Sequence, residues 1–385
     1  KMVIEYLPDG RNSFPKLPPR EPSTEPRRWT TTLQYVRAHR GEFVYDDKST
    51  PWKVIARNLD VTVSRPGDQY VGTASFSNGL VAIQNYVPFR TDMNTRFRID
   101  GGRILLDPIN LVTDGTRSVL KGDVNLSYWP EQMYAVTSTI DLPRMRQLFF
   151  ARDKFELAGT ATFDGVFHLF KDFRPDGTTR TGRELKGHFR SATAHVDDYR
   201  FDDLRGYVRW IPEALEVHDA SARVYGGTAD FEYAMAPLGV RGTPAVNRFD
   251  ASYENIDLTT LSDAFELQGI RLAGQLSGHN LLEWPSGRFA QRQGGGGMRF
   301  TPPAGTALMV RTDPSRGSRV PSPESRVVES GPFSPHTPLE PVPIGGNLEY
   351  RFGPEWIDIG PSRIATESTY VEFEGRTAYG SQSNI

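Results

Sequence analysis

Hydrophobic and polar residues alternate with a period of two along most of the chain. Leu59, Val61 and Val63, for example, are separated by Asp60 and Thr62. Successive side chains of an extended strand point to opposite faces, so this alternation predicts strands with one apolar and one polar face. The residues that we assign to the apolar face are Val124, Leu126, Tyr128, Phe163, Phe167, Leu169, Phe231, Tyr233, Val371 and Phe373.

Turn sequences separate the alternating segments. Ser77-Asn78-Gly79 and Asp114-Gly115 are two of them, and Asn-Gly or Asp-Gly pairs are typical of hairpin connections. Strands joined in this way form antiparallel sheets that bury one face. The sequence therefore predicts a mainly β fold, an antiparallel meander with few helices.

A sequence repeat relates two parts of the chain. Residues 133–145 resemble residues 249–261, and each copy contains an Ile-Asp-Leu triplet. A Leu-Ala-Gly triplet follows each copy, at residues 157–159 and at residues 272–274. Several matching positions at nearly the same spacing indicate a structural unit that occurs more than once.

The repeated Ile-Asp-Leu triplet predicts the start of a short helix after a strand. The carboxylates of Asp141 and Asp257 can accept hydrogen bonds from the first helical amides, so we interpret both residues as helix caps. Leu142, Met145 and Phe149 follow at spacings that share one helical face. A helix this short is not stable alone, so we expect it to dock on the sheet.

Two stretches are rich in Pro, and the second is also rich in Gly and Ser. Residues 1–30 have the composition of an extended linker, and residues 286–345 have that of a disordered insert. Together with the sequence repeat, these stretches divide the chain into three β units. We place the units at residues 31–150, 151–285 and 346–385, the last being the start of a third copy.

Charge and composition exclude several partners and chemistries. Lys and Arg total 45 against 47 Asp and Glu, whereas a nucleic-acid partner favours a basic excess. With no Cys, the chain has no disulfide, thiolate nucleophile or thiolate metal site. Its aliphatic runs are far shorter than the ~20 apolar residues of a transmembrane helix. We expect the sequence, which begins at Lys1, to be a piece of a longer protein.

The sequence contains no recognisable catalytic constellation. It has no His-Glu-x-x-His pair, no Gly-x-Ser-x-Gly elbow and no Gly-rich phosphate loop that ends in Lys-Ser/Thr. The four glycines at 294–297 have no strand before them and no helix after them, so we interpret them as flexible linker. We interpret the pairs Asp197-Asp198 and Asp202-Asp203 as charged residues at the corners of hairpins. We therefore predict no catalytic residue, no metal site and no cofactor.

The apolar face is compatible with two architectures. Packed against a second sheet, it forms the core of an ordinary β-sandwich. Left open along the strands, the same face forms a trough for an apolar guest. The alternation of residues is the same in both cases.

Several strand-like stretches that contain glycines follow one another along the chain. The stretches are His-Arg-Gly-Glu-Phe-Val-Tyr-Asp-Asp at 39–47, Ala-Arg-Asn-Leu-Asp-Val at 56–61, Leu-x-Gly-x-x-x-Phe-x-Gly at 157–165, the two Ile-Asp-Leu units, and residues 211–217 leading to Val224-Tyr225-Gly226-Gly227. In this order they resemble the periplasmic AsmA-like superfamily and, more specifically, TamB-like translocation and assembly proteins. The resemblance spans about residues 31–285 and resumes at 346–380, and the insert at 286–345 departs from it.

The resemblance implies a fold, a cargo and a location. TamB-like proteins resemble long, curled β-sheets, taco-like troughs with an apolar interior. They are anchored in the bacterial inner membrane by an N-terminal helix and reach across the periplasm. Proposed roles are transfer of phospholipid, held by its acyl chains, and assembly of outer-membrane proteins with a barrel partner. The anchor and the barrel-contacting region are both absent from these residues.

We therefore predict a non-enzymatic envelope biogenesis protein built on a curled antiparallel sheet of repeated units. The sheet forms an open trough with short docked helices and a long disordered insert. One alternative is a carbohydrate-active β-solenoid enzyme or adhesin, whose coils of roughly 20–25 residues are much shorter than this repeat. The other alternative is a plain β-sandwich interaction module.

Overall fold

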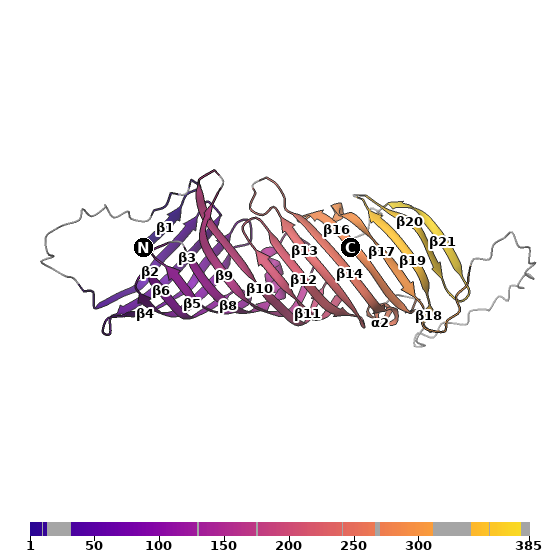
Figure 1. The fold of residues 1–385 in the computed structure, drawn as a ribbon, viewed down its shortest axis with the longest axis horizontal. Coiled ribbons are helices and arrows are strands. Elements are labelled where there is room, and N and C mark those ends of the chain that lie inside the picture. Colours follow the sequence, from indigo (N-terminus) through magenta and orange to yellow (C-terminus); the bar gives the residue numbers. More distant parts are fainter. Residues whose placement is uncertain are drawn as a thin grey trace, which may run out of the picture. The chain divides into compact units, whose positions relative to one another are not determined.

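The computed structural model places most of the chain in β-strands (Figure 1). It describes residues 1–9, 11–13, 32–128, 131–174, 176–240, 242–265, 270–310, 340–353 and 355–378. Nineteen strands belong to one curled sheet, and two short strands form a second sheet. Over the described residues the large sheet does not close on itself. Within these residues the edge strand β1 (Met2–Tyr6) pairs only with β2 (Tyr35–Asp47), and the edge strand β21 (Tyr370–Ala378) pairs only with β20 (Trp356–Ala365). The predicted fold class, a mainly β chain with an open, curled antiparallel sheet, is confirmed.

The chain divides into two compact units. Unit 1 comprises Lys1–Ala222, Phe231–Phe249 and Trp284–Phe289, and unit 2 comprises Arg223–Asp230, Asp250–Glu283 and Ala290–Ile385. The strands that contribute residues to both units are β12 (Leu215–Val224), β13 (Gly227–Ala236), β14 (Val246–Asp257) and β16 (Gln275–Pro285).

The other strands of unit 1 follow one another in a meander. They are β1 (Met2–Tyr6), β2 (Tyr35–Asp47), β3 (Trp52–Ser64), β4 (Tyr70–Ile83), β5 (Phe89–Asp100), β6 (Arg103–Thr113), β7 (Thr116–Asn125), β8 (Gln132–Asp141), β9 (Leu157–Phe173), β10 (Thr179–Val196) and β11 (Tyr199–Trp210). From β2 to β11 each strand pairs antiparallel with the next, whereas β1 runs parallel to β2. Helix α1 (Leu142–Phe149) connects β8 to β9.

Two local predictions for unit 1 need correction. The predicted linker at 1–30 contains β1, which is held by packing: Ile4 and Tyr6 are buried against Tyr45 of β2. The rest of that prediction, residues 14–30, lies outside the described residues. The pair Asp202-Asp203 lies inside β11 and not at a hairpin corner, whereas Asp197-Asp198 does join β10 to β11.

The other strands of unit 2 are shorter than most strands of unit 1. They are β17 (Gln293–Thr301), β19 (Gly345–Phe352), β20 (Trp356–Ala365) and β21 (Tyr370–Ala378), and β15 (Leu272–Ala273) pairs with β18 (Val342–Pro343) in the small sheet. The described ladder β16–β17–β19–β20–β21 is antiparallel throughout. A 3-10 turn η1 (Phe289–Gln291) precedes β17, and helix α2 (Leu258–Ala264) follows β14.

The prediction of a disordered insert at 286–345 is wrong for β17 and β18. The glycines at 294–297 lie in the first half of β17, between β16 and β19. A methyl group on Gly296 would lie 2.4 Å from the Asn280 carboxamide oxygen and 2.9 Å from the Tyr350 hydroxyl. The missing side chain therefore makes room for two polar groups of the neighbouring strands. Residues 311–339 lie outside the described residues.

The sequence repeat corresponds to a repeated structure. Asp141 and Asp257 are the N-caps of α1 and α2, as the sequence predicts, and accept hydrogen bonds from the amides of Arg144 (2.9 Å) and Thr260 (2.7 Å). The glycines of the two Leu-Ala-Gly triplets have φ values of 106° and 131°, which disfavour other residues. Each copy thus combines a capped helix with a glycine that has a positive φ.

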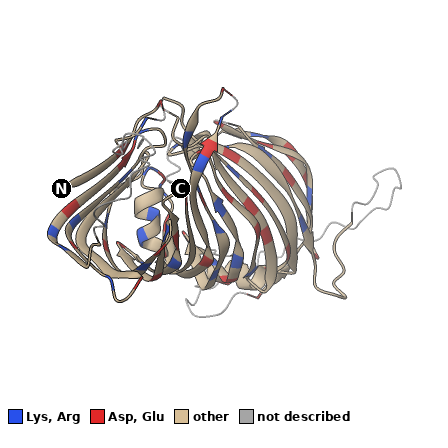
Figure 2. Cartoon of the chain, turned by 60° about the vertical axis from the view of Figure 1, so that its left-hand side comes forward, with Lys and Arg blue, Asp and Glu red and all other residues tan. Residues whose placement is uncertain are grey.

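Charged residues of both signs are interspersed along the strands (Figure 2), in agreement with the formal net charge of −2. In the described part of the chain, no helix has the length and apolar character needed to cross a membrane.

Candidate functional site

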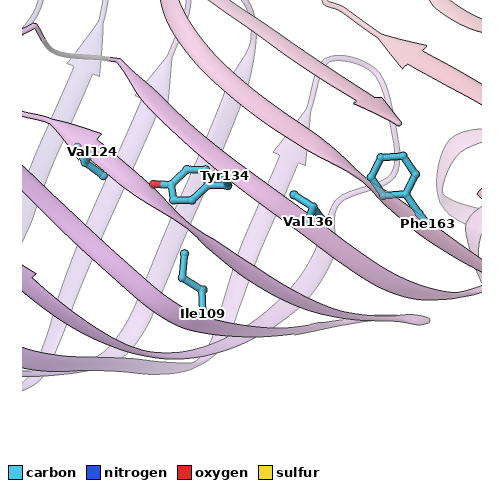
Figure 3. Packing of buried hydrophobic residues seen from close by; sticks show 5 residues of the cluster. All are labelled: Ile109, Val124, Tyr134, Val136 and Phe163. Atoms are coloured by element: carbon cyan, nitrogen blue, oxygen red, sulfur yellow. The ribbon is translucent and has the colours of Figure 1, made fainter. Parts of the chain in front are cut away.

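Four of the predicted apolar residues lie on one face of the unit 1 sheet. Phe163, Phe167 and Leu169 occupy alternate positions of β9, and Phe163 and Leu169 are each 5% exposed. Val124 of β7 belongs to the same buried cluster as Phe163, with Phe167 packed against it. Figure 3 shows Phe163, Val124 and Tyr134 of this cluster on neighbouring strands. We call this surface the unit 1 apolar face.

The unit 1 sheet curls so far that its distant strands touch. Trp52 at the start of β3 makes an edge-on ring contact with Phe167 of β9 at 5.4 Å between centroids, although β4 to β8 lie between these strands in the ladder. Arg183 of β10 stacks over the same Trp52 ring at 5.0 Å, and its Nη1 donates to the Thr50 carbonyl (2.7 Å). Residues at the start of β3 therefore meet residues of β9 and β10 across the unit 1 apolar face.

Helix α1 covers another part of the unit 1 apolar face. Leu142 packs on Ala161, which is two residues before Phe163 in β9 and so shares its face. At the other end of the helix, the Phe149 ring contacts Tyr86 at 5.1 Å and Trp210 at 5.6 Å. The chain's own helix and rings thus bury this face, which makes the middle of unit 1 a closed core.

Leu126 and Tyr128 do not belong to the apolar face. β7 ends at Asn125, whose side-chain oxygen accepts hydrogen bonds from the amides of Ser127 (3.1 Å) and Tyr128 (3.2 Å). This turn competes with continuation of the strand. Leu126 and Tyr128 are consequently 46% and 43% exposed, and the Tyr128 ring lies against Lys171.

Phe231 and Tyr233 occupy alternate positions of β13, within the residues assigned to unit 1. Phe231 makes a ring contact with Phe249 at 5.6 Å. The Tyr233 hydroxyl donates to the side-chain oxygen of Asn247 (2.6 Å), which is 1% exposed. Burial raises the pKa of Tyr233. Both residues are therefore packed in the manner of a core.

Unit 2 has an apolar face of its own, and this face is incompletely covered. Cross-strand neighbours align its side chains in rows: Met298 faces Leu348, and Tyr350 faces Ile359. We define the unit 2 apolar face by Leu276, Met298, Phe300, Leu348, Tyr350, Phe352, Ile357, Ile359, Ile364, Val371 and Phe373. Leu276 is buried and Val371 is 45% exposed, while the others are half-buried.

The predicted residues Val371 and Phe373 lie at the last strand of this face. Val371 is opposite Ile364, and Phe373 is opposite Ser362. The other side of β20 and β21 carries charged residues. There Arg376 donates two hydrogen bonds to Asp358 (2.5 and 2.9 Å), and these bonds lower the pKa of the Asp358 carboxyl.

A polar cavity of about 410 Å³ lies against the unit 1 sheet beside His39 and Asp60. The His39 Nδ1 is 2.5 Å from an Asp60 carboxylate oxygen. The pKa of Asp60 is lowered, first by the hydrogen bond from the Arg40 amide and then by that from His39. A His–Asp pair of this kind also occurs in charged surface networks, so it does not by itself identify a reaction.

Among the described residues, no group of three or more His, Asp or Glu side chains is placed to hold a metal ion. No family model, no curated protein and no solved structure matches this chain.

Proposed function

We propose that this chain is a segment of a non-enzymatic envelope protein, similar to TamB-like proteins, and that its unit 2 apolar face binds phospholipid acyl chains. The observation that carries the proposal is the continuity of this face. Four successive strands, β17, β19, β20 and β21, present apolar side chains on one side and leave them half-exposed. Contiguous exposed apolar surface marks a site of interaction.

The energetics favour an acyl chain as the occupant. Moving one methylene from an apolar environment into water costs ~0.8 kcal/mol, so a phospholipid with roughly thirty methylenes faces a barrier on the order of 20 kcal/mol. A continuous apolar surface removes much of this barrier without any catalytic group. Aliphatic and aromatic side chains, such as Leu348 and Phe300, provide that surface.

The unit 1 apolar face is not part of this proposal. Its core is filled by rings such as Phe149 and Phe167, and a phospholipid lying along this face would have to displace them and α1. We accordingly assign lipid binding to unit 2 and a supporting role to unit 1.

The proposed setting follows from the sequence resemblance. It is the periplasm, with anchorage to the inner membrane through an N-terminal helix beyond these residues. Assistance to outer-membrane protein assembly would need a barrel partner reached through regions that are likewise beyond them. Phospholipid transfer is the role that the unit 2 apolar face supports best.

Lipid analysis of matched variants tests the proposal. Leu348→Asp places a carboxylate on the unit 2 apolar face, between Met298 and the bulge of β20. Asn347→Asp places the same group one residue away on the opposite face. Each protein is expressed in bacteria, purified without detergent and examined by mass spectrometry for bound phospholipid.

We expect wild type and Asn347→Asp to retain phospholipid and Leu348→Asp to lose at least four-fifths of it, with all three folded by circular dichroism. A folded wild type that carries no phospholipid would contradict the proposal. So would equal lipid content in the two variants.

A further inference from the structure

A small cavity of about 50 Å³ lies inside unit 1, where the start of β3 meets β9 and β10. One cationic side chain, Arg183, lines it. The other lining side chains are apolar: Trp52, Ile83, Phe167, Leu185, Trp210 and Ile211. A single cation in an otherwise apolar cavity is costly unless it has a partner.

Arg183 has unused hydrogen-bonding capacity at this cavity. The residue is 6% exposed, and its Nη1 donates to the Thr50 carbonyl. Its Nη2 is fully buried and has no acceptor among the described residues. Burial lowers the pKa of Arg183 to about 10, so the side chain is still a cation at neutral pH. A buried cationic N–H group without an acceptor calls for an anion or another strong acceptor.

The neighbouring carboxylate does not fill this role. Asp47 is 2% exposed, and its oxygens accept hydrogen bonds from Ser49 (amide 2.9 Å, hydroxyl 2.6 Å) and Thr50 (amide 3.2 Å, hydroxyl 3.0 Å). In the described structure it forms no salt bridge with Arg183. The charge of Asp47 favours the cationic form of Arg183 from a distance, but its oxygens are already used by the turn.

We propose that this cavity binds the carboxylate of an aliphatic acid, with Arg183 Nη2 donating to the carboxylate and the apolar walls contacting the first carbons. A guanidinium group matches a planar carboxylate. The volume of about 50 Å³ exceeds the roughly 10–15 Å³ that one water needs. It is well below the roughly 300 Å³ of a pocket for a drug-sized molecule. The cavity therefore accommodates the carboxylate end of a ligand.

This inference does not rest on the proposed function. It concerns unit 1 and a carboxylate, whereas the proposed function concerns unit 2 and phospholipid. Either can fail while the other holds, because the variants that test them lie in different units.

Titration of the whole 385-residue chain with sodium butyrate, octanoate or hexadecanoate tests the site. Trp52 and Trp210 line the cavity, so binding should change the tryptophan fluorescence. We expect saturable binding of at least one acid, and binding of 1-octanol at least tenfold weaker than that of octanoate. Preference for butyrate identifies a small free acid as the ligand, and preference for hexadecanoate identifies a fatty acid. Failure of all three acids to bind, or equal binding of octanoate and 1-octanol, would overturn the inference.

Variants locate the site. Arg183→Met should weaken binding of the preferred acid at least tenfold. Arg180→Met is the matched control, because Arg180 is on the same strand but pairs with Asp172 and Glu213, and it should bind as wild type does. If Arg183→Met does not fold, Ile83→Phe provides the test, because the larger side chain fills the cavity while the guanidinium of Arg183 remains. Undiminished binding to a folded Arg183→Met or Ile83→Phe protein would refute the assignment.

Discussion

The two units use the same strand pattern with different results. In unit 1 the apolar face is buried, with Phe163 and Leu169 each 5% exposed. In unit 2 the corresponding face is half-exposed, from Phe300 of β17 to Phe373 of β21. Both sheets alternate apolar and polar side chains, so alternation alone does not determine whether an apolar face is closed.

The difference comes from a few residues that cross the interior. In unit 1 the contact of Trp52 with Phe167 joins distant strands, and α1 places Phe149 against both Tyr86 and Trp210. In unit 2, α2 docks beside the short strand β15, where Thr259 donates to the Leu272 carbonyl. Closure thus depends on where the docked helix and the large rings lie, more than on the strands.

The largest expected effect is that of Phe167→Asp. A carboxylate at this position would lie against Trp52 and Tyr134 in the unit 1 core, and loss of the ring adds a packing defect. We expect the free energy of unfolding to fall by about 3–5 kcal/mol. Urea denaturation followed by circular dichroism measures this change.

Val166→Asp is the control for Phe167→Asp, because Val166 points to the opposite face of β9 and pairs with Lys186. It should cost less than about 1 kcal/mol. Equal loss of stability in both variants would mean that the unit 1 apolar face is not a closed core.

Gly296→Ala should have the next largest effect. Its methyl group would clash with the carboxamide of Asn280 and the hydroxyl of Tyr350, which are hydrogen-bonded to each other. We expect a loss of about 1–3 kcal/mol in unit 2. Gly297→Ala is a matched control, since nothing lies within 4 Å of its added carbon. Thermal denaturation should separate the two variants, and identical melting temperatures would show that β17 is not packed as described.

The two helix caps should contribute equally to the free energy of unfolding. Asp141→Ala and Asp257→Ala each remove a carboxylate that accepts a hydrogen bond from a first-turn amide. Each substitution should cost about 1 kcal/mol, and Asn at the same position should restore most of it. Only Asp141→Ala should also increase the exposure of unit 1 rings, which tryptophan quenching by iodide measures. An equal increase in Asp257→Ala would contradict the special role of α1 in closing unit 1.

The smallest effect is a pH dependence in unit 1. Burial raises the pKa of Tyr86 to about 12, while an unfolded tyrosine titrates near 10. The folded state therefore holds its proton at pH values where the unfolded state releases it. This contribution to stability is complete below pH 10 and is lost as the pH rises towards 12.

We accordingly expect Tyr86 to account for a stability loss of less than about 1 kcal/mol between pH 9 and 10.5. Tyr86→Phe should show a correspondingly weaker pH dependence in urea denaturation. The same slope in wild type and Tyr86→Phe would argue against burial of this hydroxyl.

Local sequence patterns predict much of this fold. Alternation identifies β9 and β13 with their apolar residues, and the Ile-Asp-Leu triplets identify the capped starts of α1 and α2. The same reasoning wrongly extends β7 to Leu126 and Tyr128, because the turn that Asn125 begins competes with the strand. A signal was present there, since Asn favours such turns.

The remaining features depend on contacts between distant residues. Glycines at 294–297 have the composition of a linker, but they pair as a strand with β16 and β19, and side chains of these strands occupy the space beside Gly296. The meeting of Trp52, Phe167 and Arg183 likewise follows from the curl of the sheet. No local pattern specifies that curl, so the closure of unit 1 and its small cavity could not be predicted.

Photo-crosslinking in living cells reports whether phospholipid lies on the unit 2 apolar face. Benzoylphenylalanine is introduced at Leu348, on the unit 2 apolar face, or at Asn347, on the polar face of the same strand. After irradiation, purified protein is examined for covalent phospholipid adducts by mass spectrometry. We expect abundant adducts from position 348 and few from position 347. Equal yields at both positions, or no adduct at position 348, would contradict the proposed function.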